Sequence, residues 1–402
     1  MARIVTVHFA TNRMPITGSD SDRIVGFGSD LGPVDGNNIR FGSARAEVSG
    51  TDATYLPASL DVADETLFGP GADAIKRGSR TIFEPLRHDM QTGGKPTLVV
   101  IHGFSNSFAN AIERAAVILT FYGLDANVFA FSWPSRGSQG PTPLPYLDYV
   151  HDRATARASG MALARTLRIL YDFIDGLPKA AVCRQPLHLI AHSMGVFALR
   201  HGVQALIEVP VGEAREFAAA VDEPPADERQ TFPALFALPT EGPDPNRLRR
   251  TFDQVVLAAG DEDEDAFEDR RELQYLPRLA RRVTVYHTHR DWILSALSEK
   301  TKFNGPRLGV DGPENMAPIS DKVTAVDVSD VIDPTQDFQG HQYYRLFDAV
   351  RDDIAAVLRG ERQDDIPNRT PSGTGRYRLT RAGPAPAARS RAASRRRNRT
   401  DT

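Results

Sequence analysis

Residues 187–195 read Leu187-His188-Leu189-Ile190-Ala191-His192-Ser193-Met194-Gly195. An apolar strand pattern runs directly into Ser193, and residues 196–207 have the pattern of a helix. A serine between a buried strand and a helix, with small residues two positions before and after it, is typical of a nucleophile elbow. Ala191 and Gly195 are these small residues. The stretch therefore predicts a nucleophilic Ser193 whose hydroxyl projects above an open α/β sheet.

Apolar strand patterns alternate with helical patterns on both sides of this stretch. We expect strands at 96–101, 127–133, 187–190, 252–259, 282–287 and 322–328, and helices at 110–122, 152–173, 196–207 and 343–359. Continuous apolar runs suit strands that are buried on both faces of a parallel sheet. Their alternation with helices predicts the α/β class, with an α/β-hydrolase fold whose mostly parallel central sheet is flanked by helices.

Composition divides the chain into three parts. Residues 1–93 contain a strand pattern at 4–10, a helix pattern at about 71–90 and long loops, and we expect this N-terminal extension to join the main sheet. Residues 94–360 are expected to form the catalytic core. The segment 208–250 is rich in Pro, Glu and Asp, and it is either a lid insertion or a long surface loop. Residues 361–402 are expected to be an Arg-rich disordered tail.

Charge and cysteine content limit the class of protein. The net charge is −4, and 41% of residues are hydrophobic and 25% charged, which is ordinary for a soluble globular protein. Cys183 is the one cysteine, so no intramolecular disulfide can form, and we expect a buried structural thiol there rather than a nucleophile.

The sequence also carries indications of location and partners. No stretch approaches the ~20 apolar residues of a membrane-spanning helix, and the N-terminus alternates like a strand rather than a signal peptide. We therefore expect a cytoplasmic protein. The basic tail is either solvated or forms a weak contact with an anionic partner such as nucleic acid or a membrane surface.

A nucleophilic serine needs a general base and an acid that orients it. In α/β hydrolases these partners follow the serine in the order acid, then histidine, each after a later strand. Asp291 follows the expected strand at 282–287, and His341 follows the strand at 322–328. We expect these two residues to complete a catalytic triad. Asp261, in the acidic run after the strand at 252–259, is the alternative acid.

The oxyanion hole of such a site needs two backbone N–H donors. Met194, which follows the nucleophile, is expected to supply one donor, and Phe104, after the strand at 96–101, the other. Gly103 permits a tight turn there. We expect Gly103, Trp133 and His192 to bind the substrate, although Trp133 would equally suit a packed aromatic residue and His192 a local packing or hydrogen-bonding role.

These motifs together resemble one known family. The matching segments are Phe9-Ala10-Thr11-Asn12-Arg13, Ile101-His102-Gly103-Phe104, Phe131-Ser132-Trp133-Pro134-Ser135, Ala191-His192-Ser193-Met194-Gly195, Val256-Leu257-Ala258-Ala259-Gly260-Asp261, Asp291 and Gly340-His341. Over roughly residues 1–358 the chain resembles the α/β hydrolases of unknown function called DUF900, of the esterase/lipase superfamily. The resemblance implies fold and reaction type, but not substrate.

The chain departs from the family pattern in two places, and both concern the acid. Ala259-Gly260-Asp261 stands where the family often has Ala-Pro-Asp. Thr288-His289-Arg290 precedes Asp291, where a small or Asn-containing loop is usual.

From the residues and the resemblance we expect a carboxylesterase-like serine hydrolase. It would act on a small-molecule ester or acyl substrate through an acyl-enzyme, with no cofactor and no metal. The same triad serves a lipase, a thioesterase or an amidase. A non-catalytic binding protein that keeps the fold is the alternative from a different class.

Overall fold

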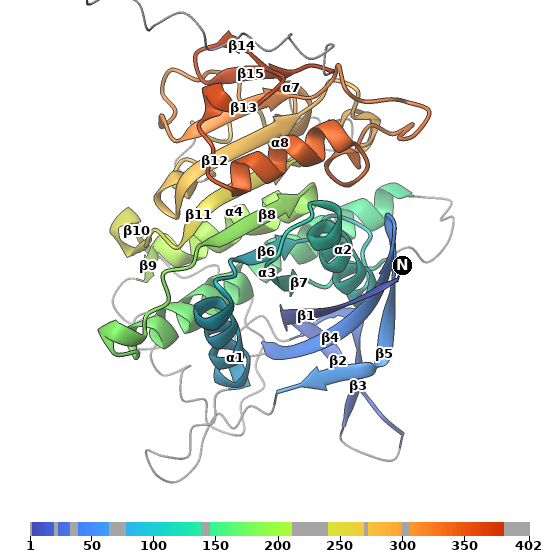
Figure 1. The fold of residues 1–402 in the computed structure, drawn as a ribbon, viewed down its shortest axis with the longest axis vertical. Coiled ribbons are helices and arrows are strands. Elements are labelled where there is room, and N and C mark those ends of the chain that lie inside the picture. Colours follow the sequence, from blue (N-terminus) through green and yellow to red (C-terminus); the bar gives the residue numbers. More distant parts are fainter. Residues whose placement is uncertain are drawn as a thin grey trace, which may run out of the picture.

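The computed structural model describes residues 2–19, 23–32, 39–63, 78–137, 145–210, 240–268, 272–299 and 306–381. Within these ranges an 11-stranded sheet runs through the molecule in the order β14-β15-β13-β12-β11-β8-β6-β7-β1-β4-β5 (Figure 1). The strands are β1 (Arg3–Thr11), β4 (Arg40–Ser49), β5 (Asp52–Val62), β6 (Thr97–Ile101), β7 (Asn127–Ser132), β8 (Leu187–His192), β11 (Phe252–Ala258), β12 (Ala280–His287), β13 (Val323–Asp327), β14 (Arg369–Gly373) and β15 (Arg376–Leu379).

The remaining elements surround this sheet. Two short hairpins lie outside it, one of β2 (Arg13–Thr17) and β3 (Ile24–Leu31) and the other of β9 (Glu208–Pro210) and β10 (Thr240–Pro243). The α-helices are α1 (Gly78–Gly93), α2 (Phe108–Phe121), α3 (Pro145–Asp175), α4 (Met194–Ile207), α7 (Leu308–Asp311) and α8 (Asp348–Leu358). No described helix combines the length and the apolar character needed to cross a bilayer.

Parallel pairing joins the strands from β1 through β7, β6, β8, β11, β12 and β13 to β15. The strands β4, β5 and β14 pair antiparallel at the two ends of the sheet. The mostly parallel α/β fold expected from the sequence is thereby confirmed. Because the central strands are parallel, their carboxyl-terminal ends all point the same way. The loops that follow β6, β8, β12 and β13 therefore lie together at this end of the strands.

Helices cover both faces of the sheet because successive strand residues point to opposite sides. Leu189 of β8 belongs to an apolar cluster with residues of α1, α3 and α4, whereas Ile190 belongs to a second cluster with residues of α2 and α8. The six strands expected downstream of residue 95 are present within one or two residues of their expected bounds.

The C-terminal region differs from the expected disordered tail. Residues 369–379 form β14 and β15, which extend the sheet beside β13. The basic residue Arg369 is only 1% exposed at its side chain, because its guanidinium contacts the buried carboxylate of Asp353 at 2.5 Å. This segment with few apolar residues is held by the buried ion pair together with the buried Leu379 and the pairing of β15 with β13. Residues 382–402 lie outside the described residues.

Two other expectations concern segment limits. The helix expected at 343–359 begins only at Asp348, after a 3₁₀ turn at Tyr343–Arg345 that is anchored in the core. The segment 208–250 contains the β9–β10 hairpin, but residues 211–239 lie outside the described residues, so the choice between a lid and a surface loop stays open.

The buried Arg369–Asp353 pair makes a stability prediction. Arg369→Ala is expected to lower the free energy of unfolding by about 3 kcal/mol, because it leaves a buried carboxylate without its cation. The matched control is Arg378→Ala in the same hairpin, where the arginine is 55% exposed and its ion pairs are long. Its expected cost is below about 1 kcal/mol. Equal losses in urea unfolding would contradict the packing of β14 described here.

Candidate active site

Ser193 occupies a strained turn between β8 and α4. Its backbone has φ 54° and ψ −126°, a conformation that a non-glycine residue adopts only when its surroundings impose it. Hydrogen bonds hold the turn on both sides: the N–H of Ser193 donates to Ala258 O at 3.0 Å, and its carbonyl accepts from Asp261 N at 3.2 Å and from Val196 N at 2.9 Å. The predicted strand-to-helix elbow is thus present in the structure.

Glycines allow the backbone around this turn to pack without side chains between. A Cβ atom on Gly195 would lie 2.5 Å from His102 O and 2.6 Å from Ile101 O. A Cβ atom on Gly103 would lie 2.8 Å from the Cβ atom of Ser193. The loop after β6 is therefore in direct contact with the elbow, as the small residues in the sequence require.

Asp291 and His341 form a buried pair. The Nδ1 atom of His341 lies 2.6 Å from Oδ2 of Asp291, and the other carboxylate oxygen of Asp291 accepts the N–H of Leu294 at 2.9 Å. Gly340 places His341 against the loop after β12. It has φ +64°, and a Cβ atom there would lie 2.3 Å from Arg290 O. Two segments 50 residues apart in the chain are thereby brought together.

The pair lies beside the elbow because His192 connects the two. Nε2 of His192 donates to the carbonyl oxygen of His341 at 3.0 Å, and the two rings lie 4.7 Å apart. On its other side the His192 ring stacks on Tyr344 at 4.3 Å. The pKa of His192 is well below its ordinary value, chiefly because of burial and then because of the nearby His341. His192 therefore packs and hydrogen-bonds locally, the alternative role expected from the sequence, and its contact with a substrate stays a prediction.

The electrostatic environment of His341 favours its charged form. Burial alone lowers the pKa of this imidazole, but the carboxylate of Asp291 more than offsets the effect, with smaller contributions from Asp261 and Asp337. The pKa of His341 is consequently raised from its ordinary value. An imidazole in this setting accepts a proton at Nε2 readily while Nδ1–H stays bonded to Asp291.

Asp261, the alternative acid, has other partners. Tyr149 OH donates to its Oδ2 at 2.7 Å, and Arg153 Nη1 lies 3.5 Å from the same oxygen. Within the described residues, the carboxylate that bonds the ring of His341 is therefore that of Asp291. Asp261 acts on His341 through its charge.

The loop after β6 is held from behind by side chains. Asn106 Nδ2 donates to Gly103 O at 3.0 Å and to Phe104 O at 2.7 Å. Ser105 has φ 56°, and its N–H donates to the carboxylate of Asp152 at 3.2 Å. Met194 is the first residue of α4, where a backbone N–H has no intrahelical acceptor. The loop and the helix start thus meet beside Ser193.

Trp133 does not line a pocket. Its side chain is fully buried, stacks on His102 with ring centroids 5.1 Å apart, and donates from Nε1 to His102 O at 2.8 Å. Burial, with Arg13 adding to the effect, lowers the pKa of His102 to about 3, so the stacked imidazole is neutral. Trp133 supports the loop after β6 through its contacts with His102. Of the two roles expected for it, the packed aromatic residue is the one observed.

The structural roles of two buried charged residues, Arg13 and Asp152, were not predicted from the sequence. The guanidinium of Arg13 donates to Asn106 O at 2.7 Å, Ser132 Oγ at 2.9 Å, Ser135 O at 2.9 Å and Gly28 O at 3.1 Å. Burial lowers its pKa to about 9, although the Asp152 carboxylate opposes this shift. Asp152 accepts from the loops after β6 and β7. The signal available was the motif Phe9-Ala10-Thr11-Asn12-Arg13, which ends at this arginine.

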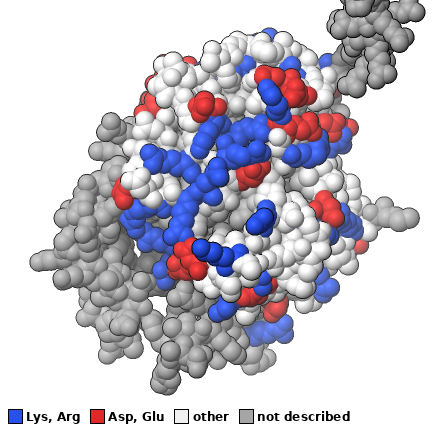
Figure 2. All heavy atoms as spheres, turned by 60° about the vertical axis from the view of Figure 1, so that its left-hand side comes forward, with Lys and Arg blue, Asp and Glu red and all other residues white. Residues whose placement is uncertain are grey.

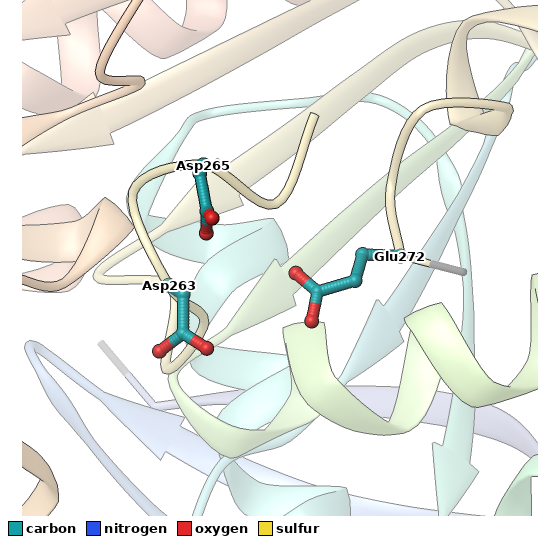
Figure 3. Close-up of side chains that lie close together, drawn as sticks. All are labelled: Asp263, Asp265 and Glu272. Atoms are coloured by element: carbon teal, nitrogen blue, oxygen red, sulfur yellow. The ribbon is translucent and has the colours of Figure 1, made fainter. Parts of the chain in front are cut away.

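A cluster of carboxylates beyond β11 could attract a metal ion. The side chains of Asp263, Asp265 and Glu272 converge within 4.8 Å (Figure 3). However, Arg307 pairs with Asp263, and Arg200 lies 2.8 Å from Glu272. Burial and neighbouring carboxylates still raise the pKa of Glu272 to about 7. Arginines therefore already supply positive charge to two of the three carboxylates.

Comparison with known proteins identifies a family. A family model described as alpha/beta hydrolase of unknown function (DUF900) matches residues 82–362. The matched range contains the elbow, the loop after β6 and the Asp291–His341 pair. No curated protein matches the chain.

The raised pKa of His341 predicts a pH-dependent stability. A histidine whose pKa is higher in the folded state stabilises the fold fully below its unfolded pKa, and this contribution is lost as pH rises through the folded pKa. Asp291→Asn removes the partner, so its cost in free energy of unfolding should reach about 3 kcal/mol at acid pH and shrink at alkaline pH.

Urea unfolding at about pH 5.5 and about pH 9 measures this difference. The control is Asp291→Asn in a His341→Gln background, where no imidazolium is present and the cost at acid pH should be largely lost. Burial also raises the pKa of Asp291, so the comparison between backgrounds is made at acid pH. An undiminished cost at acid pH in the His341→Gln background would show that another group is responsible.

Proposed function

This chain belongs to the DUF900 family of α/β hydrolases, and we propose that it is a serine hydrolase that cleaves small carboxylic esters through an acyl-enzyme. The observation that carries the proposal is the 2.6 Å contact between His341 and Asp291 beside the strained elbow at Ser193. A buried His–Asp pair next to a serine held at positive φ supports the proposal of a catalytic triad.

The first half of the reaction transfers the acyl group to the enzyme. The Ser193 hydroxyl attacks the acyl carbon while Nε2 of His341 accepts the hydroxyl proton. The N–H groups of Met194 and Phe104 stabilise the negative oxygen of the tetrahedral intermediate. The intermediate then collapses, the bond to the alcohol breaks, and His341 gives its proton to the departing alcohol.

The second half releases the acid. Water attacks the acyl carbon of the ester on Ser193 and loses a proton to His341. Collapse of this intermediate breaks the bond to Ser193, whose oxygen recovers the proton, and a carboxylic acid leaves. Asp291 accepts the Nδ1–H of His341 throughout, which fixes the tautomer and stabilises the imidazolium.

The architecture gives these steps a rigid frame. Because Gly103 and Gly195 bring the loop after β6 into contact with the elbow, the two proposed oxyanion donors keep a fixed relation to the nucleophile. That loop is held through buried hydrogen bonds by four side chains, those of Arg13, Asp152, Asn106 and Trp133. Such preorganised donors stabilise developing charge without reorganising during the reaction.

Loss of the nucleophile tests the proposal directly. Ser193→Ala is expected to reduce kcat on p-nitrophenyl esters by about 10⁶-fold, because the remaining groups cannot form an acyl-enzyme. A fluorophosphonate probe should label the wild-type chain at Ser193 and fail to label the variant. The control is Ser49→Ala, an exposed serine on β4, which should retain labelling and turnover. A folded wild-type chain that neither takes the label nor turns over esters would support a non-catalytic binding protein.

The choice of acid makes a second prediction. Asp291→Asn should lower kcat by about 10⁴-fold because His341 loses the acceptor that sets its tautomer. Asp261→Asn should have a much smaller effect, since Asp261 bonds Tyr149 rather than His341. Both variants are compared with the wild type by initial rates on esters of increasing acyl length. Thioester and amide analogues in the same assay define which acyl bond is preferred. A larger loss in the Asp261 variant would reverse the assignment.

A further inference from the structure

A cavity of about 500 Å³ lies at the end of the sheet away from Ser193. It is lined by Thr97, Leu187 and Phe252, which are the first residues of β6, β8 and β11. Ser193 follows the last residue of β8. At about 3.3 Å per strand residue, the mouth and the nucleophile are therefore separated by roughly 20 Å.

The walls of the cavity are apolar. Val99 and Phe131 line it from the sheet, and Leu86 of α1 and Leu163 and Leu167 of α3 line it from the helix layer. Its volume falls in the range of about 300–1,000 Å³ that is typical of small-molecule sites. The cavity thus lies between the sheet and one of its covering layers.

Partial exposure of central residues shows that the space is not filled by the described residues. Val99 is half-buried although its strand neighbours Leu98 and Val100 are buried. Leu170 and Phe173 on α3 are likewise only partly covered. Protein interiors normally pack without voids of this size, because open apolar surface forfeits both burial and contact. A ligand with an apolar chain would restore them.

The mouth of the cavity is positively charged. Arg87, Arg184, Arg249, Arg250 and Arg281 line it, against the single carboxylate of Asp253. Three of these arginines have acidic partners. The pairs are Arg87–Glu84, Arg249–Asp175 and Arg281–Asp253. Arg184 and Arg250 are exposed and have no acidic partner among the described residues.

Basic side chains also extend over the wider surface, with groups of Asp and Glu at their margins. Figure 2 brings forward the side on which α1 and the β9–β10 hairpin lie in Figure 1, and it shows a band of Lys and Arg side chains there. The apolar chamber therefore opens onto a surface that attracts anions.

We propose that this cavity binds a free amphiphile with one alkyl or acyl chain and an anionic head, such as a fatty-acid carboxylate. The chain occupies the apolar chamber, and the head lies at Arg184 and Arg250. Burial of the chain supplies the hydrophobic part of the affinity. Guanidinium groups select the head, because they form charge-assisted hydrogen bonds with carboxylates and repel cations. The inference does not rest on the proposed esterase activity.

Calorimetric titration of the full chain with monomeric dodecanoate tests the proposal. Dodecyltrimethylammonium, with the same chain and the opposite charge, is the ligand control. We expect saturable dodecanoate binding, weakened about tenfold or more by Arg184→Glu with Arg250→Glu, since two attractive contacts become repulsive. The matched control is Arg3→Glu with Arg45→Glu, two exposed arginines outside the cavity, which changes net charge equally and should leave binding unchanged.

Cys183 provides a second measurement that needs no substitution. This single cysteine is only partly buried, unlike the buried thiol expected from the sequence, and it lines the cavity. Bound dodecanoate should therefore slow its alkylation by iodoacetamide. Val99→Phe should reduce both binding and protection by filling the chamber. Absence of saturable binding would overturn the proposal. Binding whose affinity is unchanged by Arg184→Glu with Arg250→Glu, and which leaves Cys183 unprotected, would also overturn it. Capture by anionic vesicles without any binding of monomeric dodecanoate would overturn it too, in favour of a membrane surface.

Discussion

The contact on which the rest of the site depends is the backbone packing between Gly195 and the end of β6. With no side chain at Gly195, the first turn of α4 lies against the carbonyl groups of Ile101 and His102. This contact sets the position of the nucleophile and of the neighbouring loop at once. Glycines allow the same close approach further along α4, where it packs against α3. Gly202 of α4 lies against Leu163, and Gly160 of α3 lies against His201. The helix that follows Ser193 is thus seated by close approach along much of its length.

Buried charge organises the groups around this contact. Two of these buried groups, Asp291 and Arg13, have defined partners, as burial of an isolated charge would cost several kcal/mol. Asp291 has His341, and Arg13 has four oxygen acceptors on three separate segments. Asp261 is tied to Tyr149 yet still favours protonation of His341 through space. The acid that orients the histidine and the acid that only adds charge are distinguished by hydrogen bonds rather than by position in the chain.

Local pattern and chain order were sufficient to predict much of this arrangement. Strand, small residue, serine and helix are contiguous, so the elbow is visible at residues 187–207, and the order of the later strands places Asp291 and His341. The roles of Trp133, His192 and Arg13 were not predictable in this way. They depend on contacts such as that between Arg13 and Ser132, 119 residues apart. The β14–β15 hairpin escaped prediction because single buried residues, Arg369 and Leu379, rather than an apolar run, tie it to the fold.

The strand order has a consequence for how the chain is made. From β8 onward each parallel strand, β11, β12, β13 and then β15, adds to the outer side of the one before it. A chain emerging from the ribosome therefore presents an open strand edge after each addition, and open edges invite pairing with other chains. Within the described residues, the antiparallel β14–β15 hairpin ends this series, with β14 outermost. β14 is short and carries Pro371, which has no backbone N–H to donate, and both features discourage pairing with other chains. The exposed edges that arise during synthesis are thus followed, after His341 has been made, by an edge strand that pairs poorly.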